Sequence, residues 1–86
     1  MTRFPQVLLN LRVRSRSNLA ENVAVQTAVG RAEERLGRHG RVLVRFSGTE
    51  PLVRIMVEGE DGAASRREAL ALAEVLAREL GGEGPQ

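Results

Sequence analysis

Two runs of alternating apolar residues, separated by the short polar segment 47–51, constrain the fold of this chain more than any other feature. The alternating residues are Val42, Val44 and Phe46 in the first run and Val53, Ile55 and Val57 in the second. A period of two is typical of a strand with one buried face. Gly48 and Pro51 in the polar segment favour a turn. The pattern therefore predicts an antiparallel hairpin with both apolar sets on the core face.

The register of this hairpin predicts that two arginines face each other. If Phe46 lies opposite Val53 on the core face, Arg45 lies directly opposite Arg54 on the other face. Like charges at such positions repel each other unless an anion lies between them. A guanidinium group is planar and fits phosphate oxygens, so the pair favours a phosphate site.

The polar segment adds hydrogen-bond donors for an anion. Ser47 and Thr49 carry hydroxyl groups, and Gly48 permits an unusual backbone conformation or a close approach by a ligand. The alternative is an ordinary hairpin loop whose arginines are hydrated or pair with Glu50 and Glu58. Spacing alone does not decide between these two interpretations.

The rest of the sequence predicts a strand and a helix before the hairpin and a helix after it. The expected elements are a strand over residues 7–13, a helix from about Asn22 to Leu36, and a helix that begins near Asp61 or Ser65 and ends at Gly81. Ser65 and Glu68 have the spacing of a capping box. Asn22 is a favourable N-cap, and Gly37 is well placed to end the first helix. Gly30 lies inside that helix, which indicates weak local stability or close packing. The order β-α-β-β-α predicts an α+β fold with a small antiparallel-rich sheet of three to four strands and two helices on one face.

Length and composition predict one small domain. We expect residues 1–80 to form it and residues 81–86 to be a flexible tail. The apolar runs are too short to span a bilayer and no signal peptide opens the sequence, so we expect no membrane partner and a cytoplasmic location. The chain has no cysteine, and its one histidine, His39, has no neighbouring ligand, so we expect neither a disulfide nor a metal site.

A nucleic-acid-binding module is the alternative from another functional class, because β-α-β-β-α domains often serve that role. The formal net charge is only +2, although Arg12, Arg14 and Arg16 alternate after the first strand. Proteins that bind single-stranded nucleic acid usually stack bases on aromatic side chains, and this chain has two phenylalanines and no other aromatic residue. We therefore expect no nucleic-acid partner and interpret the three arginines as a hydrated strand face.

The hairpin sequence also resembles a known family. The run Arg45-Phe46-Ser47-Gly48-Thr49-Glu50-Pro51-Leu52-Val53-Arg54, within residues 40–61, is similar to the C-terminal domain of the α-D-phosphohexomutases. Residues 4–13 resemble the first strand of that domain, and the resemblance extends to about Leu80. The ending at residues 56–61 is similar to the phosphoglucosamine mutase branch, with the same domain of a phosphoglucomutase or phosphomannomutase as the near alternative.

This resemblance implies a fold of the TATA-binding-protein-like kind and a loop that holds the substrate phosphate that is not transferred. The residues that match the phosphate loop are Arg45, Ser47, Gly48 and Thr49, with Arg54 alongside and with Glu50 and Pro51 as support for the loop. This chain has Phe46 where the family commonly has Lys or Pro. The implied role is to position the substrate, and no catalytic residue is implied in this chain.

The resemblance further implies that the full-length enzyme interconverts glucosamine 6-phosphate and glucosamine 1-phosphate, for UDP-N-acetylglucosamine synthesis. In the family, the reactive Ser loop, the Mg²⁺ loop and the sugar-reading loop lie in earlier domains, and this sequence contains none of these motifs. The implied partners are a phosphosugar and the other domains of the same enzyme. We expect no cofactor in this chain, Mg²⁺ in the other domains, and no turnover by the chain alone. A domain that kept only an interaction role is a third possibility.

Overall fold

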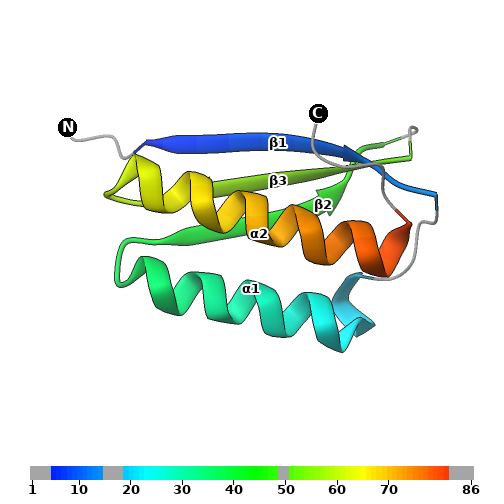
Figure 1. The fold of residues 1–86 in the computed structure, drawn as a ribbon, viewed down its shortest axis with the longest axis horizontal. Helices are drawn as coiled ribbons and strands as arrows, with labels where there is room; N and C mark the ends of the chain where they lie inside the picture. Colours follow the sequence, from blue (N-terminus) through cyan, green and yellow to red (C-terminus); the bar gives the residue numbers. More distant parts are fainter. Residues whose placement is uncertain (1–4, 15–18, 49–50, 82–86) are drawn as a thin grey trace.

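The computed structural model describes residues 5–14, 19–48 and 51–81 of the 86-residue chain. In chain order the elements are β1 (Gln6–Arg12), the short 3₁₀ helix η1 (Leu19–Glu21), α1 (Val23–Leu36), β2 (Arg41–Phe46), β3 (Leu52–Glu58) and α2 (Gly62–Leu80). This order of strands and helices confirms the predicted α+β class (Figure 1).

The three strands form one antiparallel sheet in the order β1-β3-β2. The hairpin strands β2 and β3 are therefore neighbours, while β1 pairs with the other edge of β3. Over the residues that the structure describes, the sheet has three strands, the lower of the two numbers that the sequence predicts. Since β3 lies in the centre, its inward-facing residues Val53, Ile55 and Val57 are all fully buried.

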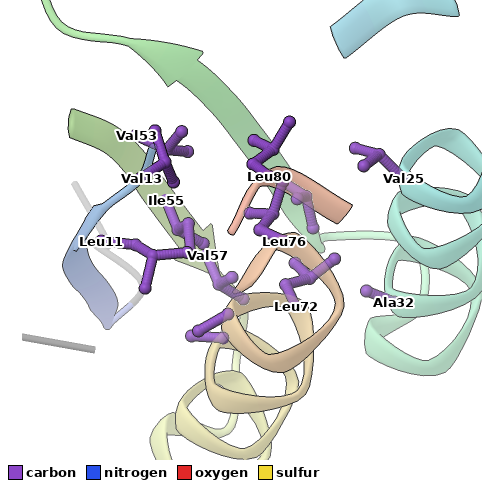
Figure 2. Close-up of a cluster of buried hydrophobic side chains, with 13 residues drawn as sticks. Leu11, Val13, Val25, Ala32, Val53, Ile55, Val57, Leu72, Leu76 and Leu80 are labelled. Atoms are coloured by element: carbon purple, nitrogen blue, oxygen red, sulfur yellow. The ribbon is translucent and has the colours of Figure 1, made fainter. Parts of the chain in front are cut away.

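Both long helices cover the same face of this sheet, and no helix of the described residues lies on the opposite face (Figure 1). α2 packs against β1 and β3, whereas α1 packs against α2 and β2. Figure 2 shows the resulting core, in which side chains from the sheet meet the apolar faces of the two helices. The fully buried residues with the largest side chains there are Leu11, Ile55, Leu76, Leu80, Val25, Val53 and Val57. We call the uncovered side the open face of the sheet.

Side-chain caps and glycines with positive φ set the ends of the helices. The Asn22 side chain accepts a hydrogen bond of 3.1 Å from the Val25 N–H, as expected for an N-cap. Gly37 and Gly81 end the two helices with φ of 86° and 69°, which glycine adopts at little cost. The predicted roles of Asn22, Gly37 and Gly81 are confirmed.

The start of α2 settles the choice between its two predicted caps. The Asp61 carboxylate accepts hydrogen bonds from the N–H groups of Ala63 and Ala64, at 2.9 and 3.3 Å. Ser65 is fully buried instead, and its hydroxyl donates to the Asp61 carbonyl at 2.9 Å. The capping interpretation of Ser65 was therefore wrong, because Asp61 already satisfies the first free N–H groups of the helix.

Two other expectations need correction. A Cβ added at Gly30 would meet no atom within 4 Å, so close packing does not explain this glycine. Arg14 is exposed, but it does not lie on a strand face, because β1 ends at Arg12. The Arg14 N–H donates to the Leu80 carbonyl at 3.1 Å, and its side chain lies against Gly81. Arg14 thus packs on the end of α2, while Arg16 lies outside the described residues.

Candidate phosphate-binding site

The hairpin brings the two predicted arginines together. Arg45 of β2 is paired with Arg54 of β3, and Phe46 is paired with Val53, as the alternation predicts. Both arginines are exposed, whereas Val53 and Ile55 on either side of Arg54 are fully buried. Since side chains alternate along a strand, Arg45 and Arg54 project from the open face. They lie at the end of the sheet where the loop of residues 47–51 joins the two strands.

Backbone hydrogen bonds anchor both ends of this loop. The Ser47 N–H donates to the Leu52 carbonyl at 2.9 Å, which closes the hairpin. The Pro51 carbonyl accepts a bond of 2.8 Å from the Val13 N–H, which joins the loop to the chain just after β1. Thr49 and Glu50, two of the residues assigned to the site from the sequence, lie outside the described residues.

The fold does not require a glycine at position 48. It is exposed, its φ is not positive, and a Cβ added there would meet no atom within 4 Å. The expectation of an unusual backbone conformation is therefore wrong. The remaining expectation is a close approach by a ligand, which an exposed glycine permits and a larger side chain would restrict.

The described acidic side chains do not neutralise the arginine pair. Glu58, a partner considered from the sequence, lies at the opposite end of β3 between Gln6 and Arg41. It accepts a hydrogen bond of 2.9 Å from the Gln6 side chain. Within the described residues, neither Arg45 nor Arg54 forms an ion pair. An anion that binds between the two arginines would therefore relieve the repulsion between their charges.

β1 brings two more polar residues to the same end of the open face. Asn10 is paired with Arg54 on the other side from Arg45, and Arg12 is paired with Leu52. Both residues are exposed. The sequence does not connect them with the loop, because nothing in the local pattern shows which edge of the hairpin β1 joins.

Other polar groups lie away from this end. A groove of about 280 Å³ is lined by residues of α1 and α2, among them Arg35 and Glu68, which form an ion pair of 2.9 Å. Hydrogen bonds to the Glu68 carboxylate raise the pKa of Arg35. The Nε2 atom of His39 lies 3.3 Å from the Oε1 atom of Glu60. The part of the chain that the structure describes contains no group of three potential metal ligands, and neither of its long helices is apolar enough to cross a membrane.

The sequence of this chain matches a known family. A family model described as phosphoglucomutase/phosphomannomutase, C-terminal domain, matches residues 8–75, which include all three strands except the first two residues of β1. The chain belongs to this family. As a phosphoglucomutase/phosphomannomutase C-terminal domain, it includes the paired arginines and the loop within the matched range.

Similar curated proteins are phosphoglucosamine mutases. The chain is 48% identical over 80 residues to the protein from Hydrogenovibrio crunogenus, 51% over 76 residues to that from Cellvibrio japonicus, and 50% over 80 residues to that from Symbiobacterium thermophilum. These matches cover 93%, 88% and 93% of this chain, but only 18%, 17% and 18% of the relatives. The chain therefore corresponds to less than one fifth of each relative.

The fold is also similar to a protein of a different kind. The alpha subunit of aIF2 from Pyrococcus abyssi matches with a TM-score of 0.59, over 95% of this chain and 33% of that chain. The sequence identity is 19%, so the similarity concerns the fold alone.

Proposed function

We propose that this chain is the C-terminal domain of a phosphoglucosamine mutase and that it binds the phosphate of the sugar substrate that is not transferred. The observation that carries the proposal is the exposed pair Arg45 and Arg54, which face each other beside the loop without a described counter-ion. The relatives at about 50% identity support the choice of the glucosamine branch. The same domain of a phosphoglucomutase or phosphomannomutase is the near alternative, because the sugar-reading loop lies elsewhere in the family.

In this proposal, each group of the loop end has a separate role. The guanidinium groups of Arg45 and Arg54 donate to phosphate oxygens, where charge-assisted hydrogen bonds are strong and directional. The Ser47 hydroxyl and the backbone next to Gly48 complete the cradle, with Thr49 assigned by its match to the family motif. Glu50 and Pro51 support the loop, and the hydrogen bond from Val13 to Pro51 fixes its far end.

This site positions the substrate and does not break bonds. Phosphoryl transfer in the full-length enzyme needs a reactive serine and Mg²⁺, which supplies charge stabilisation when bound, and we assign both to the other domains. Binding energy from the remote phosphate helps to hold the reacting end of the sugar in line. We therefore assign to the full-length enzyme the interconversion of glucosamine 6-phosphate and glucosamine 1-phosphate, in the cytoplasm, and no turnover to this chain alone.

An NMR titration of the 86-residue chain with glucosamine 6-phosphate tests the proposal. We expect amide shifts centred on Arg45, Ser47, Gly48 and Arg54 and a Kd of roughly 1 mM, because one exposed loop offers only a few charge-assisted bonds. Inorganic sulfate should shift the same amides, as a second tetrahedral anion.

Arg45→Gln and Arg41→Gln separate a specific site from general attraction. Both variants remove one charge from the open face, but Arg41 lies at the end of the sheet away from the loop. We expect Arg45→Gln to weaken binding about tenfold and Arg41→Gln to weaken it less than twofold. Equal effects of the two variants, or no shifts at tens of millimolar ligand, would overturn the proposal. Binding to single-stranded RNA that weakens steeply with salt would support a nucleic-acid module instead.

A further inference from the structure

We infer that the open face of the sheet docks against another domain of the same polypeptide, through a row of three apolar side chains, Leu8, Met56 and Leu43. This inference rests on the proposed function, because it needs the other domains that the proposal assigns to the full-length enzyme. It concerns a surface that lies outside the phosphate loop. We call these three residues the apolar row.

The apolar row crosses the whole sheet. Leu8 of β1 is paired with Met56 of β3, and Met56 is paired with Leu43 of β2. Val7 and Leu9, on either side of Leu8, pack against the core, so Leu8 projects from the open face. Leu8 is 71% exposed and Leu43 is 46% exposed, while Met56 between them is partly buried. Because directly opposite residues have Cβ atoms about 4.5–5.5 Å apart, the three side chains form one continuous strip.

The surroundings of the apolar row distinguish it from ordinary exposed residues. Single exposed apolar side chains are common in folded proteins, and Val23 of α1 and Leu70 of α2 are examples in this chain. The apolar row instead lies between two polar rows of the same face, Gln6-Glu58-Arg41 and Asn10-Arg54-Arg45. An apolar centre with a polar rim is typical of an interface between folded surfaces. A strand face that only meets water favours polar residues at such positions.

The length of the substrate places another domain close to this row. In the proposed function, Arg45 and Arg54 hold one end of a phosphosugar, and the reactive serine belongs to another domain. A single hexose separates the two groups, so that domain must come within the length of one sugar of the arginine pair. Met56 lies two residues from Arg54 along β3, which is roughly 7 Å in a strand. The apolar row is therefore within reach of the domain that carries the reactive group.

Size and charge both disfavour a second copy of this chain as the partner. Three side chains, none of them wholly exposed, present much less than the roughly 800 Å² that each partner buries in a stable complex of separate proteins. In a two-fold dimer through the apolar row, Arg54 would face Arg54 of the second copy, or, with the strands reversed, Arg45 would face Arg41. A tethered domain needs less contact area, because the covalent link raises its effective concentration.

Thiol labelling tests the inference, because this domain has no cysteine of its own. The variants Leu8→Cys and Leu43→Cys each place one thiol in the apolar row. The rate of reaction with a maleimide is measured at the labelled peptide by mass spectrometry, in the 86-residue chain and in the full-length enzyme. We expect both thiols to react about tenfold more slowly in the full-length enzyme, since they are accessible only while the domains are apart.

Leu70→Cys is the matched control, because Leu70 is also an exposed leucine but lies on α2, on the helical side of the sheet. Its rate should differ by no more than about twofold between the two proteins, because no docking covers it. Each cysteine variant of the 86-residue chain should bind inorganic phosphate as the unmodified chain does, which shows that the variant is folded.

The outcomes separate the inference from the proposed function. Unchanged rates at Leu8→Cys and Leu43→Cys, or equal slowing at Leu70→Cys, would overturn the inference, while phosphate binding that depends on Arg45 left the proposed function standing. Labelling of the 86-residue chain that slows as its concentration rises would assign the apolar row to a second copy and would also overturn the inference. No phosphate binding, with no effect of Arg45→Gln, would overturn the proposed function and the inference with it.

Discussion

Individual glycines of this chain have different physical reasons to be glycine. Gly37 and Gly81 have positive φ, and Gly48 is exposed beside the candidate site. Gly30 meets none of these conditions: it lies within α1, has no positive φ, and has open space where a Cβ would be. Gly40 differs again, because a Cβ there would collide with the Cβ of Leu36 and contact the Gly37 carbonyl oxygen at 3.3 Å.

These environments predict opposite effects for the same substitution. We expect Gly30→Ala to raise the free energy of unfolding by up to about 1 kcal/mol, because alanine favours the helix and its methyl group meets nothing. Gly40→Ala should lower that free energy by about 1–3 kcal/mol, since Leu36 and the backbone must move to admit the methyl group. Urea denaturation of both variants measures the two changes. A loss of stability in Gly30→Ala would contradict our view of α1.

At the scale of the elements, the sequence predicts most of what the structure shows, because helix ends and strand faces depend on local chemistry. Asn22, Gly37 and Gly81 each act through their own side chain or backbone conformation, so their roles can be identified from neighbouring residues. The register of Arg45 with Arg54 likewise follows from alternation on both sides of one short loop.

The elements also show where local reasoning stops. Ser65 satisfies a capping pattern with Glu68, but Ser65 is buried in the turn of α2 and Glu68 pairs with Arg35 of α1. Neither contact can be inferred before the packing of the two helices is known. The same limit hid Arg12, since its approach to the loop depends on which edge of the hairpin β1 joins.

The first turn of α2 provides a test at this scale. Asp61→Ala removes the acceptor for the N–H groups of Ala63 and Ala64, and we expect it to lower the free energy of unfolding by about 1 kcal/mol. Asp61→Asn is the matched control, because an asparagine side chain retains an acceptor oxygen at the N-cap. Urea denaturation should show a clearly smaller loss for Asp61→Asn. Equal losses for the two variants would mean that the cap contributes nothing and that the charge alone matters.

At the scale of the whole molecule, one helical layer covers one face of a three-stranded sheet (Figure 1). The exposed arginines of the candidate site project from the other face. Ligand binding therefore does not need to displace any part of the core. An anion that binds the folded chain and not the unfolded chain must stabilise the entire domain. The fold and the site are linked through this equilibrium.

Thermal unfolding measures that link. At a phosphate concentration of 100 times Kd the stabilisation is about 2.7 kcal/mol, which corresponds to a rise of roughly 10–20 °C in Tm for a domain of this size. Phosphate also strengthens apolar burial in proteins generally, so the informative comparison is with Arg45→Gln in the same buffer. We expect a smaller rise in that variant. The same rise in both proteins would show that the effect does not come from the arginine pair.

The strand order β1-β3-β2 also has a consequence in time. β2 and β3 are joined by residues 47–51 alone, whereas β1 reaches β3 only when the whole of residues 13–51 is brought back on itself. Closing the short loop costs less entropy, so we expect the hairpin with its arginine pair to appear early in folding and β1 to dock later. The arginine pair would thus be assembled first, and the end of β1 with Asn10 and Arg12 would arrive with the last strand.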